Sequence, residues 1–175
     1  MTICTVDVAH SEISFQVKHM MVSKVKGHFD SYLAKVEAED LEDLTGATLY
    51  FEFEVASINT KNKDRDYHLL SADFFDADKY PKITFQSTEI TGSTSNYEVT
   101  GKLTIRDVTK PVTFLVAFNG KGTNPWGATV YGFEGSTIIN REEFGLTWNA
   151  ALETGGVLVG KDIKILIDLE LTPEG

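Results

Sequence analysis

The sequence predicts an all-β protein: an antiparallel barrel of about eight strands with one short helical insertion. Apolar and polar residues alternate along most of the chain, one segment departs from this alternation, and turn-forming stretches separate the alternating segments. The chain has 175 residues, 42% of them hydrophobic, which suffices to bury one substantial core. No linker-like stretch or internal repeat divides it, so we expect a single domain over residues 1–175.

Alternation with a period of two residues predicts the strands, because successive side chains of a strand point to opposite faces of a sheet. The pattern is clearest in residues 49–55 and 97–105. It also marks four further segments, residues 13–19, 83–85, 112–118 and 163–171. Two weaker segments, residues 25–36 and 129–140, bring the expected number of strands to about eight.

One segment breaks the alternation and predicts a helix between Asp64 and Phe75. Asp64 is placed as its N-cap, and Tyr67, Leu70 and Phe74 recur at the spacing of one helical face. With so little helix, only the sheet itself can cover its dry face, as a sandwich or a barrel, and the hairpin-sized connections favour a barrel. Such a barrel is either filled by its own side chains or holds one small ligand, and the residues alone leave both open.

Charge and composition limit the partners and the compartment. The 26 acidic and 16 basic residues give a net charge of -10, which repels phosphate backbones, so we expect no nucleic-acid partner. No apolar run approaches the roughly 20 residues of a membrane span, so no stable membrane insertion is expected. The first residues lack a leader, and the single cysteine, Cys4, cannot form an internal disulfide; both features predict a cytoplasmic protein. Cys4 is expected in a mobile N-terminal segment.

The polar residues show no catalytic or metal-binding motif. The four histidines are His10, His19, His28 and His68. Neither an HxH nor an HExxH spacing occurs among them, so we expect no metal dependence. Asp7, His10 and Ser11 have the residue types of a nucleophilic triad, but near neighbours on one strand cannot converge on a substrate.

Two charged groups have a structural and a functional interpretation. Arg65, Asp66 and His68 on the predicted helix suit capping and ion pairing, and residues 141–143 suit a charged turn after a strand. Either group could instead contact a ligand, because binding residues often lie on loops held by a rigid scaffold.

Several short motifs follow one another along nearly the whole chain: DVAHS (7–11), FQVKHM (15–20), VKGHFD (25–30), ASINT (56–60), RDYHL (65–69), DFFD (73–76), PKITF (81–85), GKLTI (101–105), TKPV (109–112) and INREEFGL (139–146). In this order they resemble the YceI-like family of lipocalin-like polyisoprenoid-binding proteins. The resemblance implies an eight-stranded lipocalin-like barrel with a helical insertion, enclosing a long apolar tunnel. It implies a bacterial protein that binds a polyisoprenoid, a quinone or a fatty amide, often as a homodimer, without catalysis. Many relatives are exported, whereas this sequence shows no leader.

The ligand is expected on the inward face of the strands. The apolar residues predicted to line the tunnel are Phe15, Val17, Phe29, Phe51, Phe85, Leu103, Phe114, Phe133, Ile139 and Ile165. His19 is expected to contact a polar head, with Trp148 at the mouth, and plain core packing is the alternative for both. Burial of apolar surface would hold the tail without any charged contact.

We therefore expect a non-enzymatic protein that binds, stores or transports an amphiphilic isoprenoid-like lipid, with no cofactor other than that lipid. A stress or interaction protein with a filled barrel is the first alternative, and it would lack a continuous cavity. A lipid-acting hydrolase or isomerase is the second, and it would need a convergent acid-base pair in the lumen.

Overall fold

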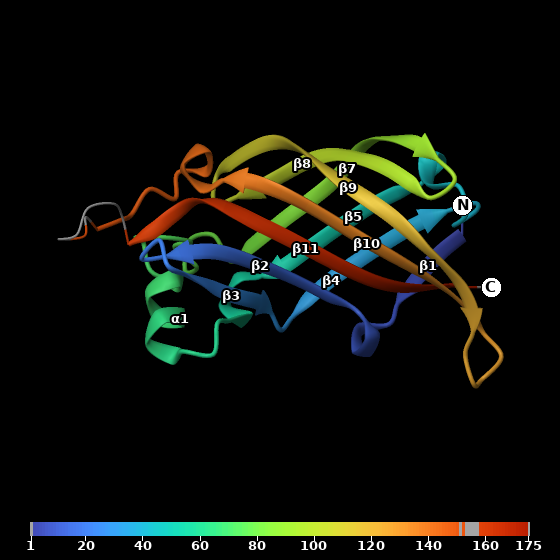
Figure 1. The fold of residues 1–175 in the computed structure, drawn as a ribbon, viewed down its shortest axis with the longest axis horizontal. Helices are drawn as coiled ribbons and strands as arrows, with labels where there is room; N and C mark the ends of the chain where they lie inside the picture. Colours follow the sequence, from blue (N-terminus) through green and yellow to red (C-terminus); the bar gives the residue numbers. More distant parts are fainter. Residues whose placement is uncertain (1, 151, 153–157, 175) are drawn as a thin grey trace.

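Eight strands form a closed antiparallel barrel in the computed structural model, which describes residues 2–150, 152 and 158–174. In order around the ring the strands are β1 (Thr2–Val6), β4 (Tyr32–Ala38), β5 (Thr48–Glu54), β7 (Lys82–Ser93), β8 (Asn96–Ile105), β9 (Val108–Thr123), β10 (Thr129–Asn140) and β11 (Val159–Pro173). β11 pairs back onto β1 and so closes the ring. The barrel is elongated, and both chain ends lie at one end of it (Figure 1).

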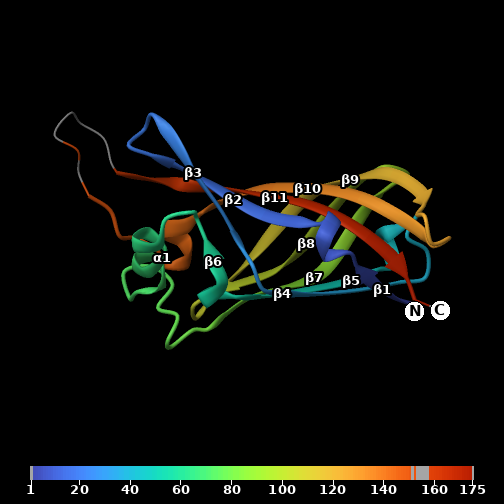
Figure 2. The same ribbon diagram turned by 90° about the horizontal axis from the view of Figure 1, so that it is seen from below.

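Three further strands build the wall at the opposite end. β2 (Glu12–His19) follows β1 after the 3-10 turn η1 (Val8–His10) and pairs with β11. β3 (Ser23–Phe29) pairs with β2 and leads through a bend into β4, and the short β6 (Ile58–Asn59) pairs with β3. Among the described strands β6 has no second neighbour, and the helix α1 (Lys63–Leu70) lies at this end of the barrel (Figure 2).

The predicted fold class is confirmed, and each predicted strand segment corresponds to observed strands, except that Val55 at the end of the segment 49–55 lies in a 3-10 turn. The segment 25–36 is divided between β3 and β4 by a bend at residues 30–31, and β7 extends well beyond residues 83–85. The sequence prediction missed β1 and β6. Cys4, expected in a mobile segment, is 3% exposed, because β1 pairs with both β4 and β11.

The helix is shorter than predicted and begins earlier. Asn62, not Asp64, is the N-cap, and its side chain accepts a hydrogen bond from the Arg65 amide at 3.1 Å. The helix ends at Leu70 because Ser71 caps it, donating through its amide and its hydroxyl to the His68 carbonyl. Phe74, which its apolar spacing assigned to the helix, therefore lies in the turns that follow α1.

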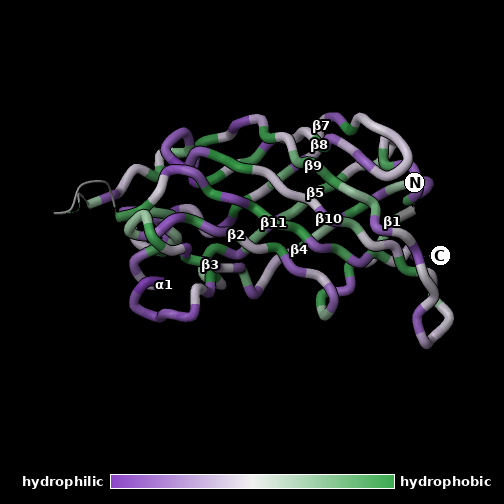
Figure 3. The backbone as a smooth tube through the Cα atoms, viewed as in Figure 1, coloured by the Kyte–Doolittle hydropathy of each residue, from purple (hydrophilic) through white to green (hydrophobic). Residues whose placement is uncertain are grey.

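Apolar side chains of alternate strand residues meet inside the barrel, and Figure 3 shows hydrophobic and hydrophilic positions following one another along the strands. Gly101 is required by this packing. A Cβ atom at this position would lie 2.5 Å from Cζ of Phe85 and 2.5 Å from the carbonyl oxygen of Gln86, so glycine makes room for the Phe85 ring.

A segment before β5 plugs the end of the barrel near the chain termini. Leu41 and Leu44, the latter in the 3-10 turn η2 (Leu44–Gly46), are each 3% exposed. The Tyr97 hydroxyl donates to the Glu42 carbonyl at 3.0 Å, and Lys121 pairs with the Glu42 carboxylate at 2.8 Å. Two more 3-10 turns, η3 (Val55–Ser57) and η4 (Arg141–Phe144), lie at the α1 end of their strands.

Candidate functional site: an apolar cavity in the barrel

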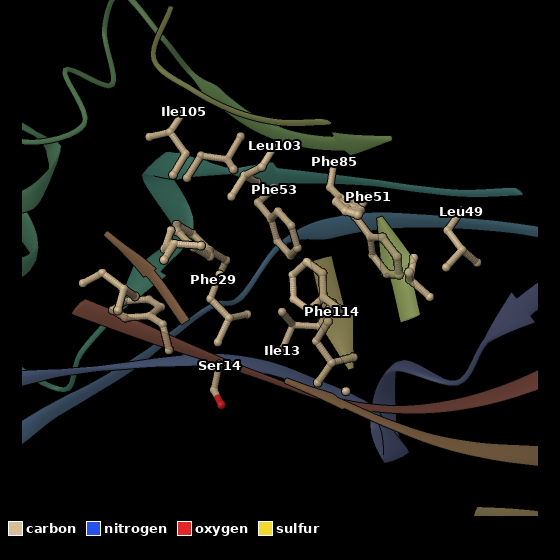
Figure 4. Close-up of a pocket in the computed structure, with 18 of the residues that line it drawn as sticks. Ile13, Ser14, Phe29, Leu49, Phe51, Phe53, Phe85, Leu103, Ile105 and Phe114 are labelled. Atoms are coloured by element: carbon tan, nitrogen blue, oxygen red, sulfur yellow. The ribbon is translucent and has the colours of Figure 1, made fainter. Parts of the chain in front are cut away.

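A cavity of about 200 Å³ lies inside the barrel. All the strands of the ring except β1 contribute to its lining, and the phenylalanine rings of residues 51, 53, 85 and 114 gather at its centre (Figure 4). The rings of Phe85 and Phe114 meet edge to face with centroids 5.2 Å apart, and Phe51 stacks on Phe53 at 6.4 Å. Among the described lining residues, the ionisable ones are Glu134, which is exposed, and Arg141.

The cavity is narrow for a long chain. An engineered cavity of roughly 150 Å³ holds a benzene molecule, so a cavity of about 200 Å³ holds only a slightly larger apolar group as it stands. A prenyl chain of several units would fit only if aromatic side chains turned aside to widen the cavity.

Ten of the residues predicted from the alternation line this cavity: Phe15, Val17, Phe29, Phe51, Phe85, Leu103, Phe114, Phe133, Ile139 and Ile165. Contact between any of them and a lipid stays a prediction.

Two predicted residues do not line the cavity, His19 and Trp148. His19 is the last residue of β2 and pairs with Val159, beyond an irregularity in the β2–β11 register. The alternation that turns Val17 inward therefore does not carry His19 into the cavity.

Trp148 instead packs over one end of the cavity, against α1 and the turns that follow it. Its ring lies 4.7 Å from the ring of His68 and 5.4 Å from that of Phe74, which lines the cavity. Nε2 of His68 lies 2.8 Å from the Asp73 carboxylate. This group of three rings joins the helical insertion to the segment after η4. A place for Trp148 at the mouth of the cavity stays a prediction.

The helical insertion and the η4 segment add lining residues that strand alternation could not identify. They are Leu69, Phe74, Phe75, Arg141 and Leu146. Residues outside strands have no period of two, so their inward direction depends on tertiary packing.

Arg141, interpreted from the sequence as part of a charged turn, is 2% exposed. Its guanidinium donates to four backbone carbonyls: Leu146 at 2.6 Å, Gly160 at 2.8 Å, Trp148 at 3.0 Å and Val159 at 3.3 Å. Burial lowers the pKa of Arg141, and the nearby Glu142 acts in the opposite direction. Arg141 therefore connects the residues that follow η4 to the first residues of β11.

The polar group on α1 has a structural role. Arg65 donates from Nε to the Thr60 hydroxyl at 2.8 Å and from Nη2 to the Thr60 carbonyl at 2.6 Å. Asp66 accepts from the Thr60 amide at 3.0 Å and from its hydroxyl. Thr60 is 3% exposed, so these bonds hold α1 to the end of β6 and satisfy buried polar atoms.

Outside the barrel, the side chains of Asp7, His10 and Glu170 each offer one atom that could hold a metal ion, and these atoms lie within 4.8 Å of one another. Nδ1 of His10 lies 2.8 Å from the Asp7 carboxylate. This hydrogen bond raises the pKa of His10 and lowers that of Asp7. None of the described helices is long and apolar enough to cross a membrane.

Residues 4–171 match the family described as the YceI-like domain. The chain belongs to the YceI-like family. A YceI-like relative in Staphylococcus aureus strain USA300, a UPF0312 protein, is 47% identical over 173 residues, which cover 98% of each chain.

Solved structures share the YceI-like fold. BcnA of Burkholderia cenocepacia has a TM-score of 0.81 and 28% identity, covering 95% of this chain and 99% of that one. The YceI protein of Campylobacter jejuni has a TM-score of 0.76 and 30% identity, covering 98% of each. A polyisoprenoid-binding domain from Saccharophagus degradans, at 12% identity and a TM-score of 0.72, covers 99% of this chain and 100% of that one and shares the fold alone.

Proposed function

We propose that this protein binds an amphiphilic isoprenoid-like lipid, such as a polyprenyl chain, a quinone or a fatty amide, and stores or carries it without changing it chemically. The observation that carries the proposal is the apolar, aromatic-lined cavity inside the barrel. An apolar chain enters such a space because its surface leaves water, at about 25 cal/mol per Å². The Saccharophagus degradans domain of the same fold is named for binding polyisoprenoids, which favours this ligand class.

The features of the cavity also weigh against the two alternatives. A filled barrel would not leave about 200 Å³ between the plug and α1. A lipid-acting enzyme would need an acid and a base that converge on a substrate. Among the described lining residues, Arg141 is committed to backbone carbonyls and Glu134 is exposed, so neither supports such a pair.

The experiment compares one substitution inside the cavity with its neighbour outside. Phe114 is 7% exposed and faces Phe85, whereas Thr113 is exposed and its hydroxyl lies 2.8 Å from that of Thr100. Phe114→Asp would bury an unpaired carboxylate, at a cost of several kcal/mol to folding or to ligand binding. Thr113→Asp should be nearly silent.

Lipid is extracted from the purified wild-type protein and identified by mass spectrometry, and a fluorescent prenyl compound is titrated into all variants. Phe114→Leu serves as a variant that keeps the site apolar and folds. We expect extractable lipid, saturable binding to wild type and Thr113→Asp, and loss of binding in Phe114→Asp. Absence of lipid together with absence of saturable binding in wild type would refute lipid binding.

We further propose that the protein forms a homodimer, as the resemblance to the YceI-like family implies, and that it lies in the cytoplasm. Sedimentation velocity tests the oligomeric state, and fractionation of the source cells tests the location. A monomer at micromolar concentration, or recovery outside the cytoplasm, would refute the respective proposal.

A further inference from the structure

The hairpin of β2 and β3 ends in an exposed apolar turn. Met20, Met21 and Val22 connect the two strands and are 45%, 62% and 86% exposed. The free end of the hairpin lies at the α1 end of the barrel and stands out from its wall (Figure 2). An isolated exposed apolar side chain needs no explanation, whereas three in succession at a projecting turn indicate a contact surface. We call these three residues the hairpin tip.

The backbone of the hairpin tip is strained. The Val22 amide donates to the His19 carbonyl at 3.2 Å, and φ is 53° at Met20 and 62° at Met21. A turn with positive φ at both central residues favours asparagine and glycine, because the left-handed conformation crowds the Cβ atom of other residues. The stability of the hairpin therefore does not account for two methionines here, and strain of this kind gathers at functional sites.

The charge of the hairpin is opposite to that of the chain as a whole. Residues 13–29 contain three lysines and no aspartate or glutamate, although the chain has a net charge of -10. Lys18, Lys24 and Lys26 are exposed, and none of them has an ion-pair partner among the described residues. Lys18 and Lys24 stand directly opposite each other on the two strands. Like charges in this arrangement repel, so an anionic partner would stabilise both lysines.

The neighbouring strand does not reverse this sign. Beside the hairpin, β11 carries the exposed side chains of Lys161, Asp162 and Lys164, and Lys164 pairs with Gln16 of β2. More distant carboxylates act weakly on a partner at the tip, because salt screens charges beyond about 8 Å at physiological ionic strength. The hairpin therefore presents a local positive surface on an acidic protein.

The lysines lie behind the hairpin tip by a distance that fits a membrane surface. Lys18 and Lys24 are each two residues from the tip, which is about 7 Å along a strand. Apolar groups of peripheral proteins enter about 5 to 10 Å into the boundary between head groups and acyl chains. Entry of the tip to this depth brings both lysines to the level of the head groups, where anionic lipids attract cations.

The small size of the hairpin tip favours a membrane over a protein as its partner. A stable protein interface buries about 800 Å² on each side, far more than three side chains supply. A bilayer needs no such area, because it combines the partition of a few apolar groups with the attraction of nearby lysines.

We propose that the hairpin tip docks the protein reversibly on an anionic membrane surface, with its three apolar side chains below the head groups and Lys18, Lys24 and Lys26 against them. The inner face of the same hairpin lines the cavity through Phe15 and Val17. Docking therefore places this part of the cavity wall next to the bilayer. The proposal goes beyond lipid binding in the cavity and does not depend on it.

Flotation of the full-length protein with lipid vesicles tests the proposal. One set of vesicles contains equal parts of phosphatidylglycerol and phosphatidylcholine, and the other contains phosphatidylcholine alone. We expect wild type to float with the mixed vesicles, not to float with phosphatidylcholine alone, and to be released from the mixed vesicles by high salt, because docking needs anionic head groups.

The decisive variant is Met20→Asn with Met21→Gly. Asparagine followed by glycine suits this turn, so the variant should melt no lower than wild type although it lacks two apolar side chains. It should bind the mixed vesicles about tenfold more weakly, because less apolar surface leaves water.

Trp126→Ser is the matched control. Trp126 is 87% exposed in the turn between β9 and β10, at the opposite end of the barrel (Figure 1). Lys121 of that hairpin is already paired with Glu42 at 2.8 Å. The control should therefore bind the mixed vesicles as wild type does.

A second variant tests the charge. Lys18→Gln with Lys24→Gln should weaken binding to the mixed vesicles about fivefold for each lysine removed. It should melt no lower than wild type, because the repulsion between opposed lysines is lost.

The proposal is overturned if wild type does not float with the mixed vesicles, if it floats equally with phosphatidylcholine alone, if either hairpin variant binds as wild type does, or if Trp126→Ser abolishes binding. Sedimentation velocity without vesicles tests for an interface between copies of the chain. A hairpin variant that changes the oligomeric state but not vesicle binding would identify such an interface and overturn membrane docking. Lipid binding in the cavity stands or falls separately, since vesicle docking requires no ligand in the cavity.

Discussion

Gly101→Ala should destabilise the barrel through two contacts that the structure specifies. The added Cβ would lie 2.5 Å from Cζ of Phe85, a side-chain atom, and 2.5 Å from the carbonyl oxygen of Gln86 on the neighbouring strand. The Phe85 ring is packed edge to face against Phe114, and the carbonyl is held in the β7–β8 ladder. Overpacking of this kind costs about 2 to 3 kcal/mol, which lowers the melting temperature by about 4 to 12 °C for a chain of this size.

Urea unfolding followed by circular dichroism measures this cost, with Gly122→Ala as the control. Gly122 lies in the same barrel on β9, and a Cβ there meets no atom within 4 Å. The control should change the unfolding free energy by less than about 0.5 kcal/mol or raise it slightly.

A double mutant separates the two contacts. Phe85→Leu removes the ring atoms that approach Gly101 but leaves the Gln86 carbonyl in place. Gly101→Ala should therefore cost about 1 kcal/mol less in the Phe85→Leu background than in wild type. The reasoning is refuted if Gly101→Ala is as mild as Gly122→Ala, or if its cost is the same in both backgrounds.

Two further predictions concern charged residues. Arg141→Met should lower the unfolding free energy by about 2 to 4 kcal/mol, because buried carbonyls lose their donor. Arg141→Lys should not restore the unfolding free energy, because an ammonium cannot reproduce the planar set of donors. Full recovery with lysine, measured by urea unfolding, would contradict this. The pKa of His10, measured by NMR, should lie above 6.5 and fall in Asp7→Asn, because the Asp7 hydrogen bond raises it. The His10 contribution to stability is complete below pH 6.5 and is lost as the pH rises through the higher pKa of the folded state. The Asp7 contribution is complete above pH 3.8 and is lost as the pH falls through the lower pKa of the folded state. The pair therefore stabilises the fold most between pH 3.8 and pH 6.5. An unchanged His10 pKa in Asp7→Asn would contradict the role of the Asp7 hydrogen bond.

The alternation of residues, together with the short connections between the strands, was sufficient to predict the barrel and most of the residues that line its cavity. In a strand, the direction of a side chain depends only on its position, so residues such as Phe51 and Phe114 could be assigned to the interior before their neighbours were known. Gly101 also belongs to this pattern, although the alternation did not reveal which ring it makes room for.

The tertiary structure decided the ends and the openings of the cavity. The plug that contains Leu44 and the ring contacts of Trp148 with His68 and Phe74 lie where strands stop or bend. At such points no period relates a side chain to its neighbours, and its direction follows from contacts between segments far apart in the sequence. The sequence by itself therefore determined a β-protein with an apolar interior, whereas only the folded chain decided how the ends of that interior are covered, because those features depend on contacts that local alternation does not encode.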